Sequence, residues 1–347
     1  MTYRDPIEGF AIETEDGLIF TVKGLSHPPD RVIAYLRYMP DPEGDRWRAG
    51  VRYRRLYHFE EQVAVLQARY PHYLYEDPVC QLRVQAVPRT QVHAVYDPCA
   101  YLADLQAQAA TGPPDGIKAH ALQLAMLLEQ AAGVPAGHIG ISGSLMLGTQ
   151  HEASDIDLLV YGAAAGRAVQ RALIRLLNDP SSSVRRLNPA ELAALHAAHR
   201  PDTPLSFDDF CRSQARKVNE GRYQGREYFV RFVKWPTEVE EKYGDRRFQP
   251  LGRVTARMRV RDDRDALFTP CRYSVEQVTF LDGAPVDNLD KVVSFRGRFS
   301  AQVQAGDRAT ARGSLERVTL QDGGVYHRLV VGGQAGDYLL AQQPEAT

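Results

Sequence analysis

The stretch that decides the fold is GISGSLMLGTQHEASDIDLLVYG, residues 140–162. Its first apolar residues end in Gly143-Ser144, a helical stretch follows, and Asp155 and Asp157 then lead into an apolar strand. Along a strand, side chains i and i+2 point to the same face. The two aspartate side chains should therefore stand side by side, while the apolar residues between and after them turn into a core.

Two neighbouring carboxylates repel each other unless a cation lies between them. A hard divalent ion such as Mg²⁺, or Mn²⁺ in its place, takes oxygen ligands, few of them from protein and the rest from water and phosphate. Gly143 lets a backbone approach closely, and Ser144 can present an amide and a hydroxyl at a helix start, which suits a phosphate group. The pattern therefore predicts a metal and phosphate site.

A buried turn without a ligand is the alternative interpretation of the same residues. Gly143 would then be a hinge between strand and helix, Ser144 an N-cap, and Asp155 and Asp157 would only make a loop soluble. Two charges in an otherwise apolar strand are costly without a partner. That cost favours the metal site over the ligand-free turn.

The same residues resemble the active-site signature of the polymerase-beta-type nucleotidyltransferase superfamily. That signature has a hydrophobic residue, Gly-Ser, a spacer and Asp-x-Asp inside an apolar strand, and here ten residues separate Ser144 from Asp155. Two further stretches, HPPDRVIAYLRY (27–38) and FTPCRYSVE (268–276), are similar to a group of uncharacterised predicted nucleotidyltransferases from archaea and bacteria. This wider likeness would cover most of the chain, and it brings no known substrate.

The resemblance implies a metal-dependent enzyme that moves a nucleoside monophosphate from a nucleoside triphosphate, such as ATP, to a hydroxyl. Gly143 and Ser144 would hold the β- and γ-phosphates. Asp155 and Asp157 would hold two Mg²⁺ or Mn²⁺ ions that clamp an in-line displacement at the α-phosphate. The acceptor stays open between RNA, DNA, a protein side chain and a small molecule, and so does the base preference.

A third carboxylate on a later strand normally activates the attacking hydroxyl in this superfamily. The best later strand is predicted over residues 227–235, but Arg231 stands in mid-strand where an aspartate is expected. Glu227, at the start of that strand, is the nearest candidate, whereas Asp208 and Asp209 lie in a predicted helix and fit worse. The implied catalytic and metal-binding set is therefore the two motif aspartates together with Glu227.

A local basic zone follows the motif. Residues 212–264 contain 15 Lys and Arg against 8 Asp and Glu, although the whole chain carries a formal charge of −1. Such a zone suits a triphosphate or a nucleic-acid backbone, and a solvated helix face is the alternative. Arg212 and Arg216 share one helix face because they are four residues apart. With Lys217, they are the candidate nucleotide-binding cations.

Three functions remain open at this stage. The first is a nucleotidyltransferase whose acceptor is RNA, DNA or another hydroxyl. The second is a non-catalytic nucleic-acid-binding protein that keeps the fold without the third acid. The third is a nucleotidyltransferase that modifies another protein, which ranks lower because the flanking regions are large for that group.

Along the chain, the pattern predicts an α+β multidomain protein. An N-terminal α+β domain over residues 1–112 ends at the linker Thr111-Gly112-Pro113-Pro114. A polymerase-beta-like α/β nucleotidyltransferase core follows over residues 115–236, beginning with a helix over 116–132 that Asp115 caps. In the N-terminal domain, Asp16-Gly17 between two apolar runs indicates a hairpin.

The tail over residues 250–347 is predicted as a separate β-rich domain. Short strand-like runs alternate with turns such as Asp282-Gly283, which favours a small barrel. The phrase FRGRFSAQVQAGDRATARGSLERV (295–318) resembles an OB-type barrel, whose outer face binds single strands or oligosaccharides. A barrel without a ligand, used for docking or dimerisation, is the alternative.

Aromatic and cationic residues interleave on two predicted strands of the N-terminal domain. Such strands can stack bases and hold phosphates, but an ordinary sheet face is the favoured interpretation. The residues concerned are Tyr35, Arg37, Tyr38, Arg52, Tyr53, Arg54, Arg55 and Tyr57.

Bulk properties restrict the class of protein. The 347 residues are 44% hydrophobic and 24% charged, which is ordinary for a globular protein. No apolar run approaches the roughly 18 residues that span a bilayer, and the N-terminus has no apolar core of a signal peptide. Four cysteines, Cys80, Cys99, Cys211 and Cys271, are far apart, so neither disulfides nor a zinc knuckle is expected. These properties predict a cytoplasmic protein without a membrane partner, and they leave the oligomeric state open.

Overall fold

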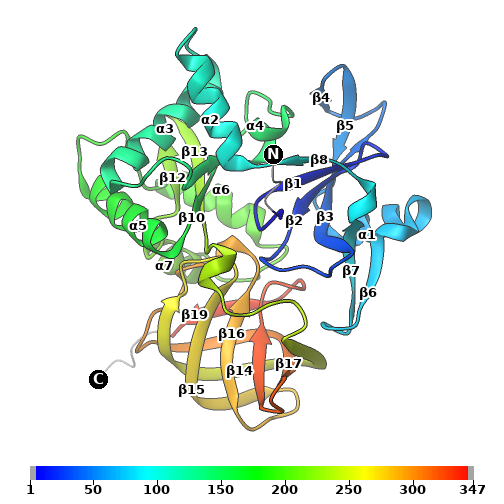
Figure 1. The fold of residues 1–347 in the computed structure, drawn as a ribbon. Coiled ribbons are helices and arrows are strands. Elements are labelled where there is room, and N and C mark those ends of the chain that lie inside the picture. The colour runs from blue at the N-terminus through cyan, green and yellow to red at the C-terminus, as the bar shows by residue number, and fades with distance from the viewer. Residues whose placement is uncertain (1–4, 343–347) are drawn as a thin grey trace. The chain divides into compact units, whose positions relative to one another are not determined.

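The computed structural model describes residues 5–342. They form two compact units, each with helices and strands, so the expected α+β multidomain class is confirmed (Figure 1). Unit 1 contains the segments 5–77, 82–185 and 219–243. Unit 2 contains the segments 78–81, 186–218 and 244–342.

The first sheet of unit 1 is built by the N-terminal region. Its strands are β1 (Ala11–Thr14), β2 (Ile19–Val22), β3 (Arg31–Pro40), β4 (Arg46–Arg48), β5 (Val51–Arg55), β6 (Leu74–Asp77), β7 (Leu82–Pro88) and β8 (Val92–Tyr96). The strand order is β4-β5-β3-β2-β1-β8, with β7 also beside β3 and β6 beside β7. The predicted hairpin joins β1 to β2, and Gly17 takes the positive φ of +74° that its turn requires. The helical segments of this region are α1 (Phe59–Arg69), η1 (Pro71–Tyr73), η2 (Arg89–Gln91) and α2 (Pro98–Ala109).

The second sheet of unit 1 carries the motif. Its strands are β9 (Ile139–Ile141), β10 (Ile156–Tyr161), β11 (Val184–Arg185), β12 (Glu220–Tyr223) and β13 (Arg226–Val233). They lie in the order β11-β12-β13-β10-β9, and β10 runs parallel to β13 and antiparallel to β9. The helical segments are α3 (Gly116–Ala132), α4 (Gly143–Leu147), α5 (Ala163–Asn178) and η3 (Pro236–Glu238). The helix expected over 116–132 is confirmed, and Asp115 precedes it at the N-cap position without a side-chain capping bond.

The central strand β10 is covered on both faces. Leu159 and Tyr161 belong to one hydrophobic core with Phe10 and other residues of the N-terminal sheet. Because side chains alternate along a strand, Leu158 and Val160 face the other side, where α3 and α5 pack against β10 (Figure 1).

Through this shared core, the N-terminal sheet and the motif sheet form one compact unit. The sequence instead predicts two domains, over residues 1–112 and 115–236. A strand that is apolar on both faces needs a covering layer on each side, and the N-terminal sheet supplies the second layer. Residues 186–218 leave this unit and belong with the C-terminal strands.

Unit 2 combines two helices with a curved sheet. Its elements are α6 (Pro189–His199), α7 (Phe207–Ala215), β14 (Arg246–Asp265), β15 (Cys271–Asp282), β16 (Leu289–Ser294), η4 (Gly297–Phe299), β17 (Arg308–Leu320), β18 (Val325–Val330) and β19 (Tyr338–Ala341). The pairings run β14-β15-β16-β18-β17 and return from β17 to β14, while β19 adds to β17. The β16–β18 pair is parallel and the others are antiparallel.

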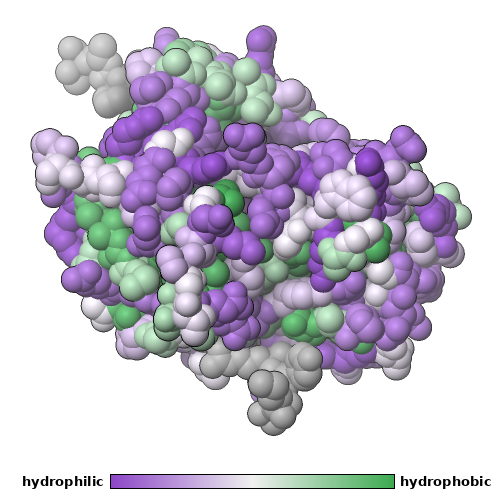
Figure 2. All heavy atoms as spheres, turned by 90° about the horizontal axis from the view of Figure 1, so that it is seen from above, coloured by the Kyte–Doolittle hydropathy of each residue, from purple (hydrophilic) through white to green (hydrophobic). Residues whose placement is uncertain are grey.

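Within residues 5–342, no helix has both the length and the apolar composition that a membrane crossing needs. The face shown in Figure 2 is mostly hydrophilic, and its apolar residues form small separate patches. The apolar residues of the strands in both units are therefore buried in internal cores.

Candidate active site

The Gly-Ser turn lies directly against Asp157. Strand β9 ends at Ile141, and the amide of Ser142 donates a hydrogen bond of 2.9 Å to the Asp157 carbonyl. Gly143 has φ +64°, and a Cβ atom there would lie 2.2 Å from Asp157 Oδ2. No larger residue fits this position unless the carboxylate moves. The turn thus exposes its backbone to the Asp157 carboxylate.

Asp155 and Asp157 lie close enough for their charges to interact. Asp155 is exposed just before β10, and Asp157 is partly buried on that strand. Burial raises the pKa of Asp157 to about 6, and the negative charge of Asp155 contributes in the same direction. Arg231, Arg55 and Arg37 act against this rise. The two aspartates are therefore an acid pair whose repulsion nearby cations partly offset.

Ser144 lies in the first turn of α4, at a helix start as the phosphate-site interpretation expects, but it is not the N-cap. The N-cap of α4 is Ser142, so the ligand-free alternative was wrong to assign that role to Ser144. The Ser144 side chain is buried, and its hydroxyl lies 3.3 Å from the hydroxyl of Ser154 in the loop before β10. This contact ties the turn to the aspartate strand.

Glu227 does not join the aspartates in a group of metal ligands. Its carboxylate accepts a hydrogen bond of 2.9 Å from Arg222, and the side chain is 55% exposed. The residue of β13 that lies in register with Asp157 is Phe229. Across residues 5–342, no set of three or more His, Cys, Asp or Glu side chains is arranged to hold a metal ion. The role of Glu227 as third acid therefore remains a prediction.

Arg231, the cation in the middle of β13, forms an ion pair with Glu8 near the N-terminus. Its guanidinium lies 2.7 Å from the Glu8 carboxylate, which is completely buried and also receives Lys23 at 3.2 Å and the Gly24 amide at 2.9 Å. Burial raises the pKa of Glu8, but Lys23, Arg231 and the Gly24 amide outweigh it and hold the pKa below the ordinary value. Sequence reasoning missed Glu8, because no local pattern connects it to the motif.

Two further cations, Arg37 and Arg55, reach the site from the N-terminal sheet. Arg37 lies on β3 and Arg55 ends β5, where it pairs across the sheet with Tyr38. Both lower the pKa of Asp157 through their charges. The only signal in the sequence was the interleaving of aromatic and cationic residues on these strands.

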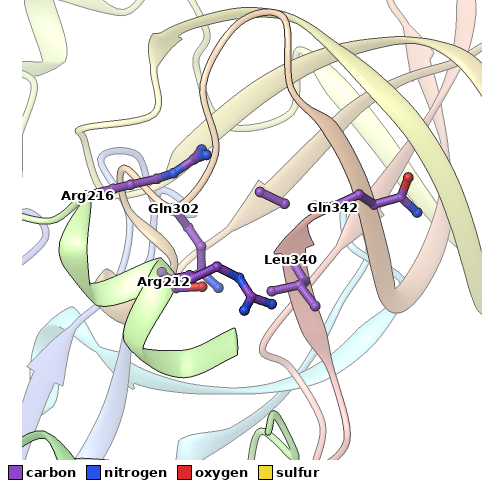
Figure 3. Close-up of a pocket in the computed structure, with 7 residues that line it drawn as sticks. Arg212, Arg216, Gln302, Leu340 and Gln342 are labelled. Atoms are coloured by element: carbon purple, nitrogen blue, oxygen red, sulfur yellow. The ribbon is translucent and has the colours of Figure 1, made fainter. Parts of the chain in front are cut away.

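The cations expected to bind the nucleotide lie in unit 2. Arg212 and Arg216 line one pocket of about 100 Å³ with Gln302, Leu340 and Gln342, as the spacing on α7 predicts (Figure 3). The two arginines form ion pairs with Asp209 and Asp307 respectively. Lys217 is buried and donates a hydrogen bond of 2.6 Å to the Arg298 carbonyl. This pocket alone is too small for a nucleotide, because ligand pockets usually measure about 300–1,000 Å³.

The basic zone over residues 212–264 is divided between the two compact units. Residues 212–218 and 244–264 belong to unit 2, whereas residues 219–243 belong to unit 1. The charge excess of this zone is divided between the two units.

Comparison with known proteins gives one extended match. An uncharacterized protein of Methanocaldococcus jannaschii is 28% identical over 329 residues, which are 92% of this chain and 94% of the relative. No family model and no solved structure matches the chain. The match runs through both compact units, and the relative's description assigns no activity.

The contact between Gly143 and Asp157 leads to a prediction with a matched control. Gly143→Ala should lower Mn²⁺ affinity about tenfold or more, the scale seen when the support of a metal ligand is disturbed, because the new Cβ displaces the carboxylate. Gly137→Ala is the control, since Gly137 also has a positive φ of +87° but nothing lies within 4 Å of its Cβ position. Both variants should lose about 1–2 kcal/mol of stability. Calorimetric titration with Mn²⁺ compares them, and equal affinities would show that the contact does not matter for metal binding.

Proposed function

We propose that the protein is a metal-dependent nucleotidyltransferase that moves a nucleoside monophosphate from a nucleoside triphosphate to a hydroxyl. The observation that carries the proposal is the Asp157 carboxylate against the Gly143 turn, with the charge of Asp155 beside it. The second sheet of unit 1 would then be a polymerase-beta-like core. Its mixed strand order, with the motif at the end of β9 and on β10, supports this assignment.

The donor set suits Mg²⁺ or Mn²⁺. Asp155 and Asp157 would hold the metal, and water and phosphate oxygens would complete its ligands, as is usual for Mg²⁺. When bound, such a metal stabilises the charge that develops on transferring phosphate oxygens. Asp157 is fixed by the strand and by the Gly143 turn, so the chain orients this carboxylate before the metal arrives.

The cations around Asp157 have a separate task. A triphosphate brings several negative charges next to two carboxylates, and this repulsion must be offset. Arg37 and Arg55 supply positive charge beside Asp157 without belonging to the metal-binding set. Arg231 offsets less of this repulsion, because it already forms an ion pair with Glu8.

A second candidate function is the binding of a nucleotide or a nucleic acid without transfer. The residues described include no third carboxylate arranged with the aspartate pair, and the mid-strand position of β13 carries Arg231, whose partner is Glu8. Without a general base, the protein would bind a nucleotide or a nucleic acid without transferring it. If Glu227 supplies the base instead, it must first leave Arg222.

Unit 2 supports a nucleic-acid acceptor over a protein acceptor. Five strands pair in the ring order β14-β15-β16-β18-β17, and β16 and β18 are parallel. We interpret this ring as an OB-like barrel, a fold that commonly binds single strands through its outer face and loops. The acceptor would then be the end of an RNA or DNA strand.

The decisive experiment incubates the full-length protein with each radiolabelled nucleoside triphosphate and Mg²⁺ or Mn²⁺. Short RNA, single-stranded DNA and the protein itself serve as acceptors. We expect metal-dependent label on one acceptor and release of pyrophosphate. If label reaches no acceptor although the nucleotide binds, the non-catalytic function is favoured.

A further inference from the structure

Arg37 and Arg55 are two partly buried cations on the N-terminal sheet. Among the residues that the structure describes, no ion pair joins either guanidinium to an acid, and Arg55 Nε is buried without a hydrogen-bond partner. Arg37 donates only a long hydrogen bond of 3.3 Å to the Leu56 carbonyl. Burial and the neighbouring charge of Arg55 lower the pKa of Arg37. Buried charges are normally paired. The charge of Asp157 offsets part of the charge of Arg37 and Arg55, and the two cations can still take a further anion.

The same two guanidinium groups flank an exposed aromatic ring. Arg55 Cζ lies 4.6 Å from the centroid of the Tyr57 ring, and Arg37 Cζ lies 5.3 Å from it. Tyr57 itself is 56% exposed, so its ring is accessible to a ligand. An exposed aromatic ring and two guanidinium groups therefore lie together.

The position of the two arginines and Tyr57 relative to the aspartate pair restricts the chemical class of ligand that could bind there. The N-terminal sheet, which carries both arginines, covers the face of β10 on which Asp157 lies, so their positive charge is on the side of the proposed metal site. A ligand that spans Tyr57 and this site needs a flat apolar face at one end and negative charge at the other. A nucleotide has both features, because its base stacks on aromatic rings and its phosphate binds guanidinium groups.

We propose that Arg37, Arg55 and Tyr57 form a nucleotide-binding platform, on which the ring stacks a base and the guanidinium groups bind its phosphate. The nucleotide is either a free nucleoside triphosphate or the terminal nucleotide of a single strand, since both carry this chemistry. The choice of ligand rests on the proposed function, but the platform itself requires neither metal nor transfer. It is a set of cations separate from Arg212, Arg216 and Lys217, whose role in nucleotide binding stays a prediction.

The test is equilibrium binding in the presence of EDTA, which separates the platform from the metal site. Calorimetry measures the binding of ATP, GTP, CTP, UTP and a short oligothymidylate to the full-length protein. Tyr57→Leu and Arg55→Gln should each weaken binding about tenfold or more, the scale of one base–aromatic stack. Tyr57→Phe should bind nearly as the wild type, because it keeps the ring. If the variants weaken the binding of a nucleoside triphosphate, the ligand is the free nucleotide. If they weaken the binding of the oligothymidylate, the ligand is the end of a single strand.

Trp47→Leu is the matched control. Trp47 is 58% exposed, and Arg52 lies over its ring at 4.8 Å, so it is a similar arginine–aromatic pair on the neighbouring strands β4 and β5. It should bind nucleotide as the wild type does. Equal binding by the Tyr57→Leu, Arg55→Gln and wild-type proteins would overturn the platform while leaving the proposed function intact. Absence of binding by every probe would also overturn it, and the transfer experiment would then judge the proposed function separately.

Discussion

Asp155→Asn combined with Asp157→Asn is expected to reduce nucleotidyl transfer by roughly 10³-fold or more, equivalent to about 4 kcal/mol of barrier. The double variant should also lose Mn²⁺ binding. Both effects have one reason, since neutral amides replace the two anionic ligands that would hold the metal. Label transfer and calorimetric titration with Mn²⁺ provide the two measurements.

Stability separates this loss from misfolding. Burial and the charge of Asp155 raise the pKa of Asp157 to about 6, so its ionised form is disfavoured in the folded protein. For a raised acid pKa, stability is highest below the unfolded pKa, near 4, and is lost as the pH rises through about 6. The double variant removes this cost, so at pH 7 it should be at least as stable as the metal-free wild type. Active sites often trade stability for function in this way.

Asp104→Asn with Asp208→Asn is the control for the aspartate pair. It changes the net charge by the same amount, and both residues are exposed on helices α2 and α7. This variant should keep metal binding and transfer. If the Asp155 and Asp157 variant binds Mn²⁺ with wild-type affinity, the metal site lies elsewhere.

The sequence was sufficient where the structure depends on local patterns. Gly143 and the two aspartates lie within fifteen residues. Strand alternation alone predicts that the two aspartate side chains point to the same face, without knowledge of the fold. The hairpin at Gly17 and the helix over 116–132 follow from equally local rules.

The sequence was insufficient where distant segments meet. Glu8 reaches Arg231 across 223 residues, and nothing near Glu8 indicates a buried carboxylate. Arg37 and Arg55 meet Asp157 only because the N-terminal sheet covers one face of β10. Short strands such as β4 and β12 were also missed, because three or four residues are too few to show a period of two.

The cations predicted to bind the nucleotide show a related limit of local patterns. Arg212 on α7 and Arg216 at its C-cap do line the same pocket, as their spacing predicts. Spacing on a helix does not say which unit the helix joins, and α7 packs with the C-terminal strands of unit 2. Net charge along a sequence window therefore indicates a basic surface only when the window folds as one piece.

The second large effect is expected at the buried acid that joins the N-terminus to the motif sheet. Glu8→Gln should lower the free energy of unfolding by about 3 kcal/mol, the lower end of the range for breaking a buried ion pair. The variant leaves Lys23 and Arg231 together without their shared anion. Their side chains remain 25% and 27% exposed, so water can partly solvate them, which is why the lower end of the range applies.

Urea unfolding at several pH values measures this contribution and its sign. The pKa of Glu8 is held below its ordinary value of 4.5 in the folded protein, so the stabilisation is present above that value and is lost as the pH falls through the lower folded pKa. The difference between wild type and Glu8→Gln should therefore be largest near neutral pH and shrink in acid. Glu76→Gln is the control, because Glu76 is 70% exposed and its ion pair with Arg83 should contribute at most about 1 kcal/mol. If both variants lose equally little stability, the Glu8 cluster does not hold the N-terminal sheet to β13, and the shared core alone must do so.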